Sequence, residues 1–169
     1  MSNVTITEEA EEFPVRLKPE VKAQWVAALR GGDYQQGTNT LRTRNYDAET
    51  GEWANGPDRF CCLGVLCELA VKDGAIPPGS ATEADKDYEY GADAFTSVLP
   101  AEVVHWAYRG QEDYSAPAEG QEDRWNNPQA GAHSLGEWND GGWNWSEGVS
   151  SERPTVPFDG IADLIEQYL

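Results

Sequence analysis

Arg59-Phe60-Cys61-Cys62-Leu63-Gly64-Val65-Leu66-Cys67-Glu68-Leu69-Ala70 is the one long apolar run in a chain that is otherwise polar and acidic. Only Gly64 and Glu68 interrupt it, and a helix that is apolar almost all round is normally buried on several sides. A run of about twelve residues is long for a strand, and Lys72-Asp73-Gly74 has the composition of a helix end. The sequence therefore predicts a buried central helix over about residues 60–73.

Length and charge limit what the rest of the chain can be. The chain has 169 residues and a formal net charge of −18, from 30 acidic and 12 basic side chains. Residues 1–14 read as an acidic flexible tail, and residues 15–169 as a single globular domain. The charge excludes broad contact with nucleic-acid phosphates or an anionic membrane. It allows a basic protein partner, and also a small anionic ligand, because a pocket needs only a few local Arg or Lys side chains.

Cysteine usage and hydropathy point to a reducing, intracellular setting rather than to an exported protein. No apolar signal-peptide core and no run of about 20 apolar residues is present. Three cysteines, two of them adjacent, do not form a disulfide framework. Their Cys-Cys-x4-Cys spacing and the presence of only two histidines, His105 and His133, exclude a typical zinc site. We expect no metal and no cofactor.

The flanking segments predict an α+β domain of about five helices with a small antiparallel hairpin or sheet and long acidic loops. Turn residues 47–51 separate two strand-like segments, which predicts a hairpin. Helices are expected from Pro19 to the glycines at 31–32, from Pro100 to Ala107, from Ser134 for one or two turns, and from Phe158 onward. The first carries an apolar stripe of Val21, Trp25, Ala28 and Leu29.

A candidate ligand site lies at the start of the central helix. The predicted hairpin brings Arg42, Arg44 and Arg59 near this end, and helix N-termini attract anions. We expect a pocket formed by Gln36, Arg42, Arg59, Trp138, Asn139 and Asp140, with Trp53, Trp143 and Trp145 as further aromatics that could stack on a base. In the alternative interpretation the arginines pair with carboxylates, Asn139 and Asp140 cap a turn, and the tryptophans are core.

Five motifs are spread along the chain: Tyr34-Gln35-Gln36-Gly37, the Cys61–Cys67 block, Leu99-Pro100, Asn139-Asp140 with Gly142, and the segment from Phe158 to Glu166. Together they resemble a family of small proteins encoded mostly by bacteriophages of actinobacteria, for which no activity is established. The resemblance covers most of the chain except the acidic tail and three insertions. It implies a phage accessory protein that acts in the cytoplasm of the host, and it implies no mechanism.

Three functions therefore remain open. The first is binding of a small ligand, such as a host nucleotide or immune signal, at the site described above. The second is an acidic decoy that mimics nucleic acid and binds a basic host protein. The third is a papain-like cysteine hydrolase, in which Cys61 or Cys62 is activated at the helix N-terminus, His133 is the base, Asn139 or Asp140 orients it, and Gln36 stabilises the oxyanion.

Overall fold

The computed structural model describes residues 16–47, 49–82, 84–109, 135, 139, 143–144, 149–150 and 155–169. Its centre is helix α3 (Cys62–Lys72), which confirms the predicted buried helix. Seven of its residues are buried: Cys62, Leu63, Gly64, Val65, Leu66, Cys67 and Ala70. The helix begins at residue 62 and not at 60, because Cys61 is its N-cap, with the sulfur accepting a hydrogen bond from the Gly64 N–H at 3.4 Å.

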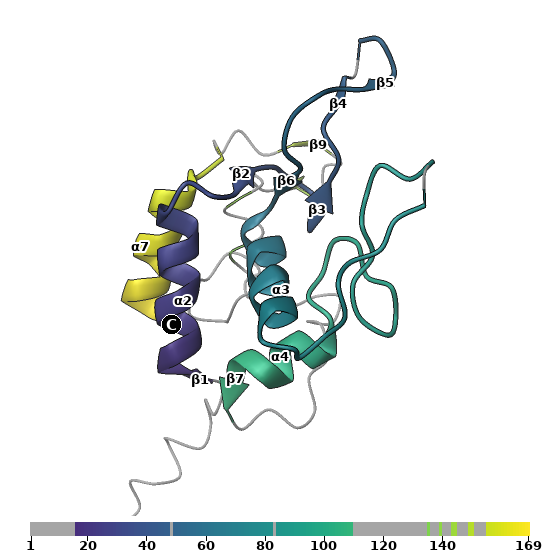
Figure 1. The fold of residues 1–169 in the computed structure, drawn as a ribbon. Coiled ribbons are helices and arrows are strands. Elements are labelled where there is room, and N and C mark those ends of the chain that lie inside the picture. Colours follow the sequence, from purple (N-terminus) through teal and green to yellow (C-terminus); the bar gives the residue numbers. More distant parts are fainter. Residues whose placement is uncertain are drawn as a thin grey trace, which may run out of the picture.

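Three further helices pack around this centre (Figure 1). Helix α2 (Pro19–Arg30) lies beside the C-terminal helix α7 (Phe158–Tyr168), and α4 (Ala101–Ala107) packs against α3. The predicted stripe of α2 is largely confirmed, since Val21, Trp25 and Leu29 are buried. The indole Nε1–H of Trp25 donates to the Cys62 carbonyl oxygen at 3.0 Å, so the two helices are also joined by a buried hydrogen bond.

A small sheet precedes α3, and it is mixed where we expected an antiparallel one. Its strands are β2 (Gln35–Gln36), β6 (Arg59–Phe60) and β3 (Arg42–Thr43), in that order. Strand β6 is parallel to β2 and antiparallel to β3. The chain leaves β3, makes an excursion over residues 44–58, and returns between the two earlier strands. Such an insertion cannot be read from local turn signals.

The excursion contains the predicted hairpin, which the structure confirms. Strands β4 (Tyr46–Asp47) and β5 (Glu52–Trp53) pair antiparallel and project from the body of the molecule (Figure 1). Two more short pairs are β1 (Arg16–Leu17) with β7 (Tyr108–Arg109), and β8 (Trp143–Asn144) with β9 (Val149–Ser150).

The described residues form four helices, so the expected count of five is wrong for this part of the chain. The missing one was predicted to start at Ser134, and of that stretch only Leu135 and Asn139 are described, both with helical backbone and fully buried side chains. The acidic tail 1–14 lies outside the described residues. None of the described helices is long and apolar enough to span a bilayer.

Close contact between α3 and the sheet depends on Gly64. A Cβ atom at this position would lie 1.7 Å from the carbonyl oxygen and 2.6 Å from the carbonyl carbon of Leu41. Both are backbone atoms, so no side-chain rotation can make room for a Cβ atom at residue 64. Gly64 is therefore required for the distance at which α3 crosses the strand β3 region.

Candidate functional site

The start of α3 is covered by Gln36 and Asn139, two residues of the predicted site that the structure brings together. The Asn139 Oδ1 accepts hydrogen bonds from Gln36 Nε2 at 2.9 Å and from the Cys62 N–H at 3.2 Å. The Asn139 Nδ2 donates to the Gly37 carbonyl oxygen at 2.9 Å. An asparagine 77 residues away thus satisfies an N–H of the first turn of α3, which the helix itself cannot do.

Gln36 connects the same point to the last helix. Its Nε2 also donates to the Val156 carbonyl oxygen at 2.8 Å, and its Oε1 accepts from the Phe158 N–H at 3.0 Å. The side-chain amides of Gln36 and Asn139 therefore join β2 to the start of α3 and to the start of α7. Asn139 is fully buried. The geometry supports a structural role for this pair, which we call the amide knot, rather than contact with a ligand.

Arg42 faces away from Arg59, although the two were expected to act together. In the register of β3 and β6, Arg42 is opposite Phe60 and Thr43 is opposite Arg59. Since neighbouring residues of a strand point to opposite faces, the two guanidinium groups lie on different sides of the sheet. Arg42 and Arg59 were expected in one pocket because the predicted hairpin brings them near the same helix end. The pairing of β3 with β6 places their side chains on opposite faces of the sheet instead.

Arg42 is engaged with carboxylates and aromatic rings. Its guanidinium lies 2.8 Å from Asp58 and 3.3 Å from Glu68, and 4.0 Å from the centroid of the Tyr88 ring. Burial opposes the charged form of Arg42, but the hydrogen bond to Asp58 and the charge of Glu68 outweigh it, and the pKa is raised. The structure thus favours the alternative interpretation for Arg42, namely that it balances internal carboxylates.

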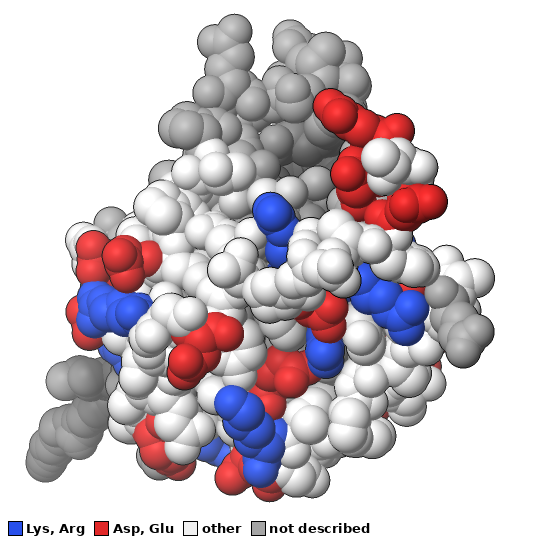
Figure 2. Space-filling view, turned by 45° about the horizontal axis from the view of Figure 1, so that its top comes forward, with Lys and Arg blue, Asp and Glu red and all other residues white. Residues whose placement is uncertain are grey.

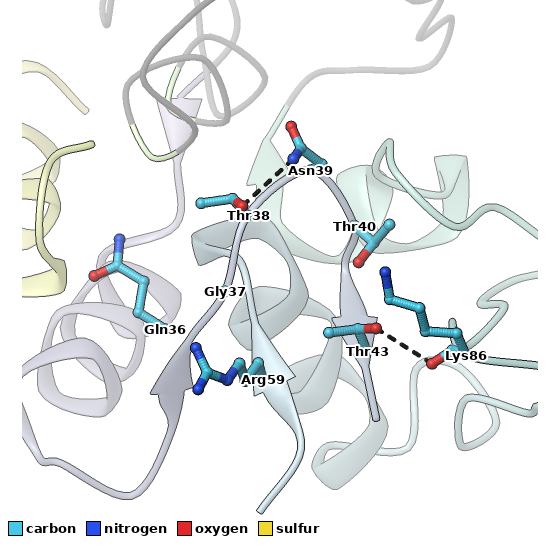
Figure 3. Close-up of a pocket in the computed structure, with 8 residues that line it drawn as sticks. All are labelled: Gln36, Gly37, Thr38, Asn39, Thr40, Thr43, Arg59 and Lys86. Atoms are coloured by element: carbon cyan, nitrogen blue, oxygen red, sulfur yellow. Dashed lines mark hydrogen bonds between the residues drawn. The ribbon is translucent and has the colours of Figure 1, made fainter. Parts of the chain in front are cut away.

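Arg59 lies on the opposite face, where it lines an open hollow of about 310 Å³ (Figure 3). None of the ion pairs found among the described residues involves Arg59. A second cation, Lys86, reaches the hollow from another segment, and its side chain extends toward Thr40. The described residues that line the hollow are Gln36, Gly37, Thr38, Asn39, Thr40, Thr43, Arg59 and Lys86.

The loop between β2 and β3 forms the rim of this hollow. Asn39 has φ of 70°, a left-handed conformation that asparagine adopts more readily than most residues. Its Nδ2 lies 3.4 Å from the Thr38 hydroxyl, and the Thr43 hydroxyl donates to the Lys86 carbonyl oxygen at 3.3 Å. Among the described residues, three threonine hydroxyls, two side-chain amides and two cations line the space, and no carboxylate does.

Sequence reasoning identified Gln36 and Arg59 but missed the threonines and Lys86. Thr38, Thr40 and Thr43 lie in the strand-like segment before the predicted turn, and a strand pattern alone does not indicate a binding role for their hydroxyls. Lys86 lies in the acidic stretch 83–93, which reads as a loop, and nothing local shows that it returns beside β3. It does so through the bridge between Thr43 and Asp87.

The cysteines of the central run are packed in the core. Cys61 is 4% exposed, and Cys62 and Cys67 are fully buried. Burial raises the pKa of the Cys67 thiol well above its usual value. Cys61 does lie at the helix N-terminus as the hydrolase hypothesis requires, but its sulfur accepts the Gly64 N–H and has little access to solvent. The base of that hypothesis, His133, lies outside the described residues.

Other predicted site residues also fall outside the described part of the chain. These are Trp138, Asp140 and Trp145, and of Trp143 only the backbone is described. Trp53 is on strand β5 of the projecting hairpin, well away from β2 and the start of α3, where the amide knot lies (Figure 1). Within the described ranges no group of three or more His, Cys, Asp or Glu side chains could hold a metal ion.

Surface charge on the face shown in Figure 2 is mixed. Basic side chains lie among the carboxylates over much of it, with one group of carboxylates at its upper right. One such mixed group is Arg30 with Asp163 and Glu166, at 2.5 and 2.8 Å, which joins α2 to α7. Exposed pairs of this kind contribute little to stability.

Comparison with known proteins gives a family but no activity. No curated protein and no solved structure matches the chain. Residues 17–169, which include every described helix and strand from α2 onward, match the family described as "Domain of unknown function (DUF8296)". The match covers the amide knot, the hollow and the central helix alike, and the chain belongs to this family.

Proposed function

We propose that the chain is a binding protein for a small anion, held in the hollow between the β2–β3 loop and Lys86. The observation that carries the proposal is the composition of the lining. In a chain of net charge −18, the described residues that line this hollow supply two cations, three hydroxyls and no carboxylate. Local charge, and not net charge, decides what a site of this size attracts.

The lining favours a phosphate-bearing ligand. Arginine and lysine make charge-assisted hydrogen bonds to phosphate oxygens, and threonine hydroxyls can donate to the remaining ones. A volume of about 310 Å³ is at the lower end of the range for small-molecule sites, about 300–1,000 Å³. The hollow fits a phosphate or a mononucleotide, with its open side left for the rest of a larger molecule.

The wider setting comes from the resemblance described above. A phage accessory protein that captures a host nucleotide or a nucleotide immune signal would need a site of this kind and no catalytic group. The buried thiols agree with such a role, since binding requires no nucleophile. The proposed residues now differ from the expected set: Arg59 stays, Lys86 and the threonines join it, and Arg42 and Asn139 become structural.

Isothermal titration with inorganic phosphate, AMP and ADP tests the proposal. We expect binding of at least one of them, weakened about tenfold or more by Arg59→Ala or Lys86→Ala, because a charge-assisted hydrogen bond is worth about 1.5–3 kcal/mol. Lys22→Ala on α2 removes the same charge away from the hollow and should leave affinity unchanged. Absence of binding by all three compounds, or equal weakening by Lys22→Ala, would contradict it.

A further inference from the structure

Lys86 is delivered to the hollow by residues 86–90, which we call the Lys86 segment. This segment runs along the edge of strand β3 that does not pair with β6. The Tyr88 N–H donates to the Arg42 carbonyl oxygen at 3.0 Å, and the Arg44 N–H donates to the Lys86 carbonyl oxygen at 2.9 Å. These two backbone hydrogen bonds flank a single β-bridge, which is a short attachment to the sheet. Side-chain contacts of the same segment add to it.

Tyr88 and Tyr90 hold the side of the Lys86 segment that faces helix α3. They are two residues apart on extended backbone, so both side chains lie on the same face. The Arg42 guanidinium lies 4.0 Å from the centroid of the Tyr88 ring. The hydroxyl of Tyr90, a fully buried residue, donates to Glu68 Oε1 on α3 at 2.5 Å, and Arg42 Nη1 lies 3.3 Å from the same oxygen. We call these four residues the tyrosine clamp, because they join the segment to the central helix.

Glu68 is the acidic residue that interrupts the apolar run of α3, and the tyrosine clamp accounts for it. Burying most of a carboxylate is costly unless the charge is paired and hydrogen-bonded, and Glu68 has both kinds of partner. Burial and the hydrogen bond to Glu68 raise the pKa of Tyr90, so the hydroxyl keeps the proton that it donates. A hydrogen bond to a charged acceptor is roughly twice as strong as one between neutral groups. The contact between Tyr90 and Glu68 is therefore a strong attachment of the Lys86 segment to the core.

We propose that Tyr90 and Glu68 are positioning residues of the anion site, whose hydrogen bond keeps the Lys86 segment docked on β3 and so keeps Lys86 at the hollow. This inference rests on the proposed function. Neither residue is among the described residues that line the hollow, so both act through Lys86. An anion that contacts Lys86 binds the docked arrangement more tightly than the undocked one. Its apparent affinity therefore falls with the fraction of molecules in which the segment is docked.

Amide hydrogen exchange followed by NMR in the ligand-free chain tests the docking. Tyr90→Phe removes only the hydroxyl, and we expect the Tyr88 and Arg44 amides to exchange about tenfold faster, the equivalent of about 1.4 kcal/mol. Glu68→Gln removes the charge of the acceptor and should accelerate the same two amides. The matched control is Tyr34→Phe, which deletes the hydroxyl that accepts a hydrogen bond from Lys72 on α3 at 2.9 Å. It should leave the exchange of both amides unchanged.

Isothermal titration with inorganic phosphate, AMP and ADP tests the effect on the site. We expect Tyr90→Phe to weaken binding about twofold or more, but less than Lys86→Ala does, because part of the population keeps the segment docked. In a Lys86→Ala background Tyr90→Phe should cause no further loss, since it acts through that lysine. A hydroxyl with a merely structural role would weaken binding equally in both backgrounds. Tyr34→Phe should leave the affinity unchanged.

The outcomes separate this inference from the proposed function. Unchanged exchange in Tyr90→Phe and Glu68→Gln, equal acceleration in Tyr34→Phe, or unchanged affinity of Tyr90→Phe would overturn the inference and leave the hollow as an anion site. A loss of affinity that persists in the Lys86→Ala background would do the same. Failure of the unaltered chain to bind any of the three compounds would overturn both.

Discussion

Replacing Asn139 with alanine should destabilise the fold by about 3–5 kcal/mol, because the Cys62 N–H, the Gly37 carbonyl and the Gln36 amide each lose a hydrogen bond to it. The Cys62 N–H loses its 3.2 Å hydrogen bond inside the core, and an unsatisfied buried donor costs about 1–3 kcal/mol. The Gly37 carbonyl and the Gln36 amide each lose a 2.9 Å hydrogen bond, at about 1 kcal/mol each since both residues are only half-buried and can recruit water. This is a large fraction of the total stability of a domain, about 5–15 kcal/mol.

Urea unfolding followed by circular dichroism measures this loss, and a double-mutant cycle with Gln36→Ala measures the coupling. We expect the double variant to lose less than the sum of the single losses by about 0.5–3 kcal/mol, because each single change already breaks the shared hydrogen bond. Asn55→Ala, at an exposed asparagine, is the control and should change stability by less than about 0.5 kcal/mol. A loss below about 1 kcal/mol for Asn139→Ala, or strictly additive effects, would refute the amide knot and restore Asn139 as a ligand-binding candidate.

Two further changes probe the central helix. Gly64→Ala should destabilise by about 3 kcal/mol or more, although alanine normally favours a helix by about 1 kcal/mol, because the new Cβ would lie 1.7 Å from the Leu41 carbonyl oxygen. The control is Gly160→Ala in α7, where the new Cβ would lie 2.7 Å from a Val156 methyl group, which can move aside by side-chain rotation. Equal urea midpoints for the two variants would contradict the reasoning. The three cysteines are buried and none is in a disulfide, so their thiols should react with a thiol reagent far more slowly in the native protein than in urea. Rapid labelling of one thiol at neutral pH would instead favour the hydrolase hypothesis.

Local sequence signals were sufficient for the four described helices, although not for the expected total of five. The apolar run at 62–72 and the stripes of α2 and α7 each carry their own period and their own end signals, so they can be read without knowing the fold. The predicted start of the central helix is two residues early, because Phe60 and Cys61 extend the apolar run, although Phe60 belongs to strand β6 and Cys61 is the N-cap.

Site geometry was harder to predict because it depends on strand register and on contacts far apart in sequence. Gln36 and Asn139 were selected for their chemistry and do meet, yet they bind each other across 103 residues. Arg42 and Arg59 were grouped by proximity in the chain, and the pairing of β3 with β6 sends them to opposite faces. Lys86 lies at the hollow because its neighbour Asp87 forms a β-bridge with Thr43. No local sequence pattern predicts this bridge.

The amide knot also has a consequence for the order in which the chain folds during synthesis. The ribosome delivers the whole of α3 before residue 139 exists, so the helix must first form with its leading N–H unpaired and with Gln36 lacking its partner. Contacts that span 77 to 122 residues close long loops and are intrinsically late events. A nascent chain that stops short of residue 139 should therefore remain a loosely packed intermediate, and the native state is complete only when Asn139 and then α7 have been added.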